Sequence, residues 1–136
     1  MAIAGVGAGD NLGTTIITGD FNADGRTDLI AEAFGAPSYS NSGRVYMFYN
    51  DGSYPTSAAS ADVMFEGEYA SYYGTALAAG DFNTDGKTDL AVGAHQYGTN
   101  TGRVYIIMSE AAVESVPASA LKTRGNFKVR GNFRVR

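Results

Sequence analysis

The chain has 136 residues, enough for one ordinary domain with a buried core. Its 18 glycines, nine tyrosines and seven phenylalanines are typical of a turn-rich β protein. The absence of cysteine excludes disulfides, thiolate metal sites and cysteine nucleophiles. No apolar run approaches the ~18 residues that a membrane helix needs, so we expect no membrane insertion.

The net charge of −4 is divided unevenly along the chain. All fourteen acidic residues and four of the ten basic ones precede residue 122, so that part carries −10, whereas residues 122–136 carry +6. Six of the acids fall in two short loops of nearly identical sequence. The acidity of the main part of the chain is therefore concentrated in a repeated motif.

Apolar runs bounded by Gly, Asn, Asp and Ser predict eight short strands. In chain order they cover residues 14–19, 28–34, 43–49, 62–66, 75–80, 89–95, 102–108 and 120–124. The run Gly-Arg-Val-Tyr begins the third and seventh strands and is followed by apolar residues, which favours β structure. We interpret residues 110–120, which contain Pro117, as a surface connection.

Two loops at 20–28 and 81–89 share the pattern Asp-Phe-Asn-x-Asp-Gly-x-Thr-Asp. Oxygen-bearing side chains at positions 1, 3 and 5 of a tightly curled loop converge on one centre, and the glycine at position 6 lets position 9 return to it. Hard oxygen ligands in this number suit Ca²⁺, with a backbone carbonyl at position 7. The predicted metal ligands are Asp20, Asn22, Asp24, Arg26 (carbonyl), Asp28, Asp81, Asn83, Asp85, Lys87 (carbonyl) and Asp89.

Metal-free hairpin turns are the alternative, since Asp, Asn and Gly make tight turns without a cation. Two matched copies favour the metal, because three clustered carboxylates without a cation repel one another. Position 12, which is a bidentate Glu in an EF-hand, is Ala31 or Val92 here. We therefore predict two structural Ca²⁺ sites in loops that each join two strands.

The sequence repeats itself with a period near 60 residues. A shift of 61 aligns Gly13-Thr14 with Gly74-Thr75 and the first loop with the second, and a shift of 59 aligns residues 43–46 with 102–105. Four-stranded units that repeat at this length are typical of a β-propeller. We expect an all-β fold with one blade and its N-terminal lead-in at 1–67, a second blade at 68–125, and a basic β-like tail at 126–136.

The two units resemble FG-GAP repeats, the blades of the integrin alpha-subunit propeller. The family pattern of Phe-Gly, Gly-Asp-x-Asn-x-Asp-Gly-x-x-Asp-Leu, Gly-Ala-Pro and Gly-x-Val-Tyr appears here as Tyr73-Gly74, residues 80–90, Gly93-Ala94-His95 and residues 102–105. The first unit has Leu12 in place of Phe and Glu32 in place of the Gly of Gly-Ala-Pro. The resemblance implies antiparallel four-stranded blades, structural calcium and an extracellular or cell-surface location, although no signal peptide is visible.

Two blades are too few for a closed ring, which needs about four to eight. An isolated pair would expose apolar blade faces and unpaired strand edges to water. Either the chain is part of a longer protein, or copies of it assemble head to tail until the ring closes. We expect a homo-oligomer, with a trimer favoured over a tetramer.

The tail contains the tandem hexamer Gly-Asn-Phe-Lys-Val-Arg-Gly-Asn-Phe-Arg-Val-Arg at residues 125–136. Alternation of apolar and basic residues predicts a strand that pairs with a neighbouring chain by β-addition. A disordered extension and a polyanion-binding arm remain as alternatives. We expect no nucleic-acid partner for the protein as a whole.

His95 is the single histidine, so no Ser/His/Asp set can be assembled without it, and no phosphate-binding glycine loop opens a helix. We therefore expect no enzyme. Aromatic residues near the predicted strand ends could bind a glycan or a protein, although any one of them could equally pack between the blades. The candidate ligand residues are Tyr39, Tyr72, Tyr73, His95 and Tyr97. The predicted function is calcium-dependent recognition or adhesion, and the alternative is a scaffold that only self-assembles.

Overall fold

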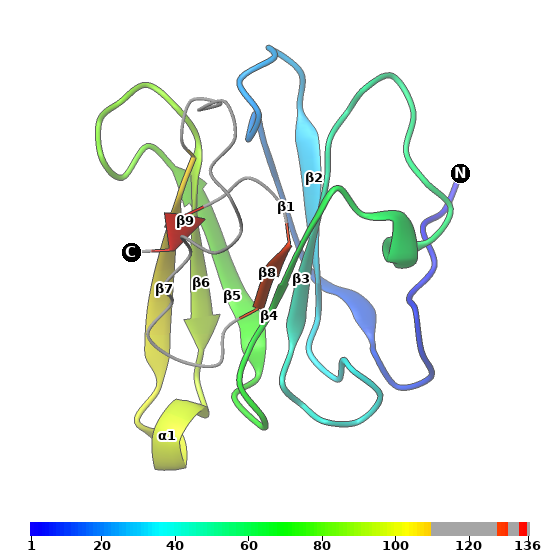
Figure 1. The fold of residues 1–136 in the computed structure, drawn as a ribbon, viewed down its shortest axis with the longest axis vertical. Coiled ribbons are helices and arrows are strands. Elements are labelled where there is room, and N and C mark those ends of the chain that lie inside the picture. The colour runs from blue at the N-terminus through cyan, green and yellow to red at the C-terminus, as the bar shows by residue number, and fades with distance from the viewer. Residues whose placement is uncertain (110–127, 131–133, 136) are drawn as a thin grey trace.

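The computed structural model describes residues 1–109, 128–130 and 134–135. Two antiparallel sheets stand side by side (Figure 1). The first contains β1 (Leu12–Gly19), β2 (Asp28–Ala33), β3 (Arg44–Phe48), β4 (Val63–Glu66) and β8 (Lys128–Arg130) in that order, and the second contains β5 (Tyr73–Gly80), β6 (Asp89–Ala94), β7 (Arg103–Met108) and β9 (Arg134–Val135). We call β1–β4 the first blade and β5–β7 the second.

The sequence prediction of an all-β fold with propeller-type blades is confirmed. Each of the seven predicted strands that fall on described residues is present, with ends within two residues of those predicted. The predicted eighth strand, 120–124, lies outside the described residues. The single-turn helices η1 (Ala58–Ser60) and α1 (Tyr97–Asn100) lie in connections. No helix in the described part of the chain is long and apolar enough to cross a membrane.

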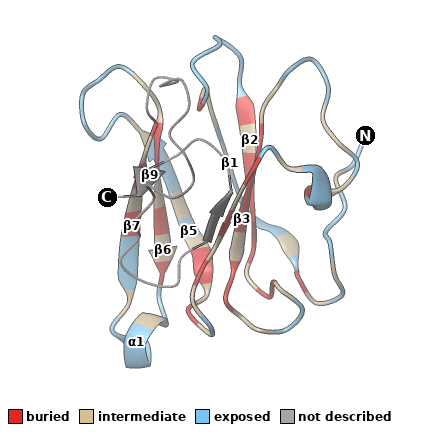
Figure 2. Cartoon of the chain, viewed as in Figure 1, coloured by how far each residue is buried: buried red, intermediate tan, exposed pale blue. Residues whose placement is uncertain are grey.

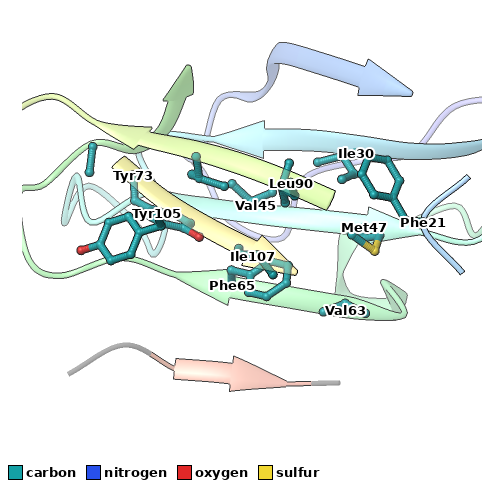
Figure 3. Packing of buried hydrophobic residues seen from close by; sticks show 12 residues of the cluster. Phe21, Ile30, Val45, Met47, Val63, Phe65, Tyr73, Leu90, Tyr105 and Ile107 are labelled. Carbon is teal, nitrogen blue, oxygen red and sulfur yellow. The ribbon is translucent and has the colours of Figure 1, made fainter. Parts of the chain in front are cut away.

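The main core lies between the two blades, where one face of each sheet is apolar. β2, β3 and β4 contribute alternate residues that are almost wholly buried, and β6 and β7 face them with buried residues from the opposite face of the repeat unit (Figure 3). The members are Phe21, Ile30, Val45, Met47, Val63, Phe65, Tyr73, Leu90, Val92, Ala94, Tyr105 and Ile107. Because side chains alternate between the faces of a strand, the period of two in β2, β3, β6 and β7 fixes which face is buried.

The blades approach most closely where β3 begins beside β5. A Cβ built on Gly43 would lie 2.0 Å from the carbonyl oxygen of Tyr73, so only glycine fits there, and the positive φ of +83° also favours glycine. The Tyr73 N–H donates to the Ser42 carbonyl at 3.0 Å, and the Ser71 hydroxyl donates to the same carbonyl at 3.0 Å. Backbone packing and hydrogen bonds thus join the two blades at this end.

The outer face of the first blade packs against the N-terminal lead-in and the 54–61 segment. Its buried residues are Ala31, Ala33, Ala36, Tyr46, Phe48 and Ala58. The lead-in is attached by a parallel bridge between Ala4 and Ser57, with the Ala4 N–H donating to Thr56 at 2.9 Å. In the second blade, by contrast, parts of β5 and β7 are exposed (Figure 2). The exposed residues of these strands include Val104 and the alanines at 76 and 78.

The tail pairs with its own chain. β8 runs antiparallel to β4, and β9 runs antiparallel to β7 in the position where the predicted eighth strand would lie. β-addition by this segment is therefore present, but it covers the outer edges of the same two sheets, whereas we expected it on a neighbouring chain. Each hexamer of the repeat supplies one short strand, because two copies of an alternating pattern can pair with two separate edges.

A carboxylate is buried within the interface between the blades. Glu32 of β2 has no solvent exposure, and neither of its oxygens has a hydrogen-bond partner among the described residues. Its Cγ lies beside Gly74, where a Cβ would approach it to 2.6 Å. Burial raises the pKa of Glu32 to about 7.

The Glu32 side chain should make stability depend on pH. Its pKa in the folded state, about 7, lies above the ordinary value of 4.5. The folded chain is therefore at full stability below pH 4.5, where the carboxyl is protonated, and loses stability as the pH rises through 7. The variant Glu32→Gln should therefore be more stable than the wild type at pH 8, by on the order of 2 kcal/mol, and should match it near pH 4.5. Denaturant unfolding from pH 4.5 to 8.5 measures the difference, and parallel profiles would contradict this account.

Candidate functional site

The two predicted metal loops lie at the same end of the molecule, at the top of Figure 1, where β1 turns into β2 and β5 into β6. Their hydrogen bonds match atom for atom. In the first loop the Asp20 carboxylate accepts from the N–H groups of Asp24 (3.1 Å) and Gly25 (2.9 Å). In the second, Asp81 accepts from Asp85 (3.0 Å) and Gly86 (2.8 Å). The repeated sequence thus produces a repeated loop conformation.

The last aspartate of each loop is buried and holds three segments together. In the first blade, the two Asp28 oxygens accept from the N–H groups of Phe21 (2.8 Å) and Asn50 (2.9 Å). In the second, those of Asp89 accept from Phe82 (3.0 Å) and Ser109 (2.8 Å). Each carboxylate therefore connects the start of its loop to the residues that follow β3 or β7.

The exposed middle positions curl through Asx-type bonds. The Asp85 carboxylate accepts from the Lys87 N–H at 3.0 Å and from the Asn83 amide at 3.0 Å, and the Asn83 bond is the main reason why the pKa of Asp85 is lowered. The same two bonds recur around Asp24. These contacts orient oxygens toward the inside of the loop with backbone N–H groups as their partners.

The loops supply oxygen donors but not a ready cluster of carboxylates. Within the described part of the chain, no three His, Asp or Glu side chains are grouped closely enough to hold a metal ion. The sequence reasoning counted an asparagine and a backbone carbonyl as additional ligands. A carboxylate oxygen that accepts one N–H bond retains a second lone pair, so each loop still offers hard oxygen donors.

A second group of side chains lies at the opposite end, near α1 in Figure 1. The ring of Tyr72 stacks on Phe34 with centroids 6.2 Å apart and lies 5.3 Å from the His95 ring. The Thr75 hydroxyl lies 3.0 Å from Nδ1 of His95. We call Phe34, Tyr72 and His95 the aromatic row; it joins residues from both blades.

The three remaining candidate ligand residues differ in exposure. Tyr39 is exposed, while Tyr97 is half-buried beneath the Arg103 guanidinium, whose carbon lies 3.5 Å from the ring centroid. Tyr73 is fully buried and packs edge-on against Tyr105 with centroids 5.2 Å apart. Tyr73 is therefore a core residue, because it faces the first blade at the start of β5, which is the packing between blades that the sequence left open as the alternative.

Sequence reasoning missed three residues at this end, Phe34, Glu68 and Arg103. Glu68 accepts a hydrogen bond from the Tyr105 hydroxyl at 2.7 Å and lies 3.7 Å from Arg103. The equivalent arginine, Arg44, instead pairs with Glu66 at 2.7 Å. The repeated Gly-Arg-Val-Tyr motif could have drawn attention to both arginines. Their acidic partners differ because Arg44 lies opposite Glu66 in the pairing of β3 with β4, whereas Arg103 lies near Glu68.

Comparison with known proteins agrees with the repeat architecture. Residues 73–107 match the FG-GAP repeat family. The chain is 39% identical over 110 residues to the phosphatidylinositol-glycan-specific phospholipase D of Bos taurus, covering 70% of this chain and 13% of the relative. It is 32% identical over 99 residues to integrin alpha-4 of Xenopus laevis (72% and 10%) and 35% identical over 119 residues to integrin alpha-3 of Mus musculus (82% and 10%).

The architecture and these matches define a class of repeat protein built from β-propeller-type blades. Within that class, residues 73–107 are an FG-GAP repeat of the integrin-alpha type. Residues 12–48 repeat its β-strand arrangement and its Asp-rich loop. The chain spans 10–13% of the length of these relatives.

Proposed function

We propose that the chain is a non-enzymatic, calcium-binding recognition or adhesion module, in which Ca²⁺ stiffens one end and the aromatic row binds a carbohydrate or protein ligand at the other. The observation that carries the proposal is this separation of the two ends. One end repeats an oxygen-rich loop with the same hydrogen bonds, and the other gathers aromatic side chains from both blades. The integrin alpha relatives support recognition as the general role.

Calcium is the cation that best suits the loops. Asp20, Asn22, Asp24, Asp28 and the carbonyl of Arg26 would hold one ion, and the corresponding second set would hold another, which gives hard oxygen donors throughout. Bound Ca²⁺ would neutralise the carboxylates and stabilise the turn between the first two strands of each blade. A structural role follows because Asp28 and Asp89 already connect three segments of their blades.

The ligand surface combines aromatic faces with polar groups. Tyr39, Tyr69 and His95 are exposed, and the half-buried Tyr72 ring lies 5.3 Å from the His95 ring. Aromatic faces flanked by hydroxyl and amide groups suit sugar rings and the side chains of a protein partner. Arg103, above Tyr97, adds a cation that could pair with an acidic group on either kind of ligand.

The absence of catalysis is also a proposal. His95 contacts Thr75 and Tyr72 and is exposed, which is a poor setting for a general base that must be held by an orienting carboxylate. The match to phosphatidylinositol-glycan-specific phospholipase D covers only 13% of that protein, and residues for its reaction could lie in the remainder. An extracellular or cell-surface location follows from the resemblance to integrin alpha subunits and from the millimolar calcium found there.

Self-assembly as the sole activity is the alternative function. It is favoured by one observation, the exposure of large apolar side chains on blade faces at Ile16, Phe82 and Val104. Under both hypotheses the ring is completed by further blades, from copies of this chain or from other parts of a longer protein. A trimer of two-blade chains remains our first expectation and a tetramer our second.

Calcium should raise the stability of the folded chain. Binding to the folded state alone stabilises it by about 2.7 kcal/mol per site at a concentration 100 times Kd. We therefore expect 2 mM CaCl₂ to raise Tm by at least about 5 °C over EDTA. Thermal unfolding followed by circular dichroism measures the shift, and the double variant Asp24→Asn/Asp85→Asn should lose most of it while the control Asp51→Asn retains it. Equal Tm values in Ca²⁺ and EDTA would refute a structural role for calcium.

The aromatic row should determine ligand binding. A printed glycan array probed with the labelled chain in Ca²⁺ should give positive spots that Tyr72→Ala weakens about 5- to 30-fold, as expected for loss of a central aromatic contact of 1–2 kcal/mol. Val6→Ala, an exposed residue of the lead-in, serves as the control and should bind as the wild type does. A blank array from a chain that still assembles would favour the scaffold alternative over glycan recognition.

A further inference from the structure

The interface between the two blades within the chain is a template for a second interface. β2, β3 and the 20–28 loop supply one side, and β5, β6 and β7 supply the other (Figure 3). Because the blades are copies, each side has a repeat equivalent elsewhere in the chain. The equivalents of the first side lie on the far face of the second blade, and the equivalents of the second side lie on the outer face of the first blade.

Residues of the first side are buried, but their equivalents are exposed. Val45 has no exposure, whereas its equivalent Val104 is 68% exposed. Phe21 is 1% exposed, whereas Phe82 is 47% exposed. The far face of the second blade therefore presents apolar side chains in the pattern that the first blade uses to bind its neighbour.

The outer face of the first blade shows the complementary pattern. Ile16 is 56% exposed, although its equivalent Leu77 packs against the core between the blades. Beside Ile16 is an apolar hollow of about 360 Å³. Among the residues that line it are Leu12, Leu29, Ala31 and Phe48, the equivalents of the core residues Tyr73, Leu90, Val92 and Ile107.

Glycines show the same difference between occupied and open positions. A Cβ on Gly74 would meet Glu32 at 2.6 Å and Val45 at 2.8 Å, but a Cβ on its equivalent, Gly13, would meet nothing within 4 Å. The residues that would fill the space beside Gly13 are the equivalents of Glu32 and Val45, namely Gly93 and Val104. Since Gly93 replaces Glu32, a second interface of this kind would bury no carboxylate.

We propose that the far face of the second blade docks head to tail on the outer face of the first blade of another copy of this chain, with Val104 and Phe82 covering the hollow beside Ile16. The proposal rests on the propeller-type module proposed above and names its partner surface. Continuity with the interface between the blades supports a second copy as the occupant. β8 and β9 cover only the outer edges of the sheets. The lead-in, whose residues 1–3 also line the hollow, covers part of the outer face of the first blade but leaves Ile16 exposed.

Solution mass tests the proposal through charge placed on either face. In 2 mM CaCl₂ the wild-type chain should have a mass of three or four times 14.2 kDa by light scattering. Val104→Asp and Ile16→Asp each place a carboxylate in the proposed interface between copies. Both positions are exposed within one chain, so each variant should fold but remain a monomer. Thr99→Asp, at an exposed position of the α1 turn between β6 and β7, is the control and should assemble as the wild type does.

Mixing the two variants makes the test specific for head-to-tail docking. The Ile16→Asp chain keeps the far face of its second blade intact, and the Val104→Asp chain keeps the outer face of its first blade intact. An equimolar mixture should therefore form a heterodimer with one interface and a mass of twice 14.2 kDa. A symmetric contact between like faces would let one of the variants assemble by itself, with no additional assembly on mixing, and would overturn the proposal. A wild type that stays monomeric up to about 1 mM would also overturn it. Circular dichroism and the calcium-dependent Tm of each variant are read separately, so the proposed calcium-binding function can survive failure of the docking proposal.

Discussion

The packing of one blade on the other is the interaction on which the rest of this structure depends. A single sheet can bury an apolar face only by packing it against another layer. Here the largest cluster of buried side chains contains residues from both blades. At one end, the backbone around Gly43 lies directly against Tyr73, which leaves no space for any side chain. This contact fixes the spacing of the blades, and the spacing brings Tyr72 and His95 of the second blade beside Phe34 of the first.

The two Asp-rich loops are joined to the same packing. Asp28 and Asp89 are buried, and their carboxylates hold the segments that follow β3 and β7. The Ser109 hydroxyl then donates to the Phe21 carbonyl at 3.2 Å, which links the end of the second blade to the loop of the first. A cation bound in either loop would therefore act on the core between the blades as well as on its own turn. The buried Glu32 in the same interface opposes this stability above neutral pH.

The repeat of about 60 residues made most of the fold predictable, because both units contain the same alternating apolar runs and the same Gly-Asp residues at the start of the loop between their first two strands. The strands and the loop conformation followed from local sequence. The pairing of the tail with β4 and β7 did not, since alternation shows that a strand can form but not which edge it meets. Tyr73 lies in the core because strand β5 begins two residues earlier than the small-residue run suggested. Phe34 and Glu68 became visible only when residues distant in sequence were brought together.

The central claim, that close backbone contact between the blades determines stability, is tested most directly by one pair of glycine variants. Both Gly43 and Gly52 have positive φ, but a Cβ on Gly43 would meet Tyr73 while one on Gly52 would meet nothing within 4 Å. Urea unfolding should therefore show a loss of about 1 kcal/mol for Gly52→Ala, from the backbone conformation alone. Gly43→Ala should lose at least about 2 kcal/mol more, because the blades must move apart. Equal losses for the two variants would contradict the account.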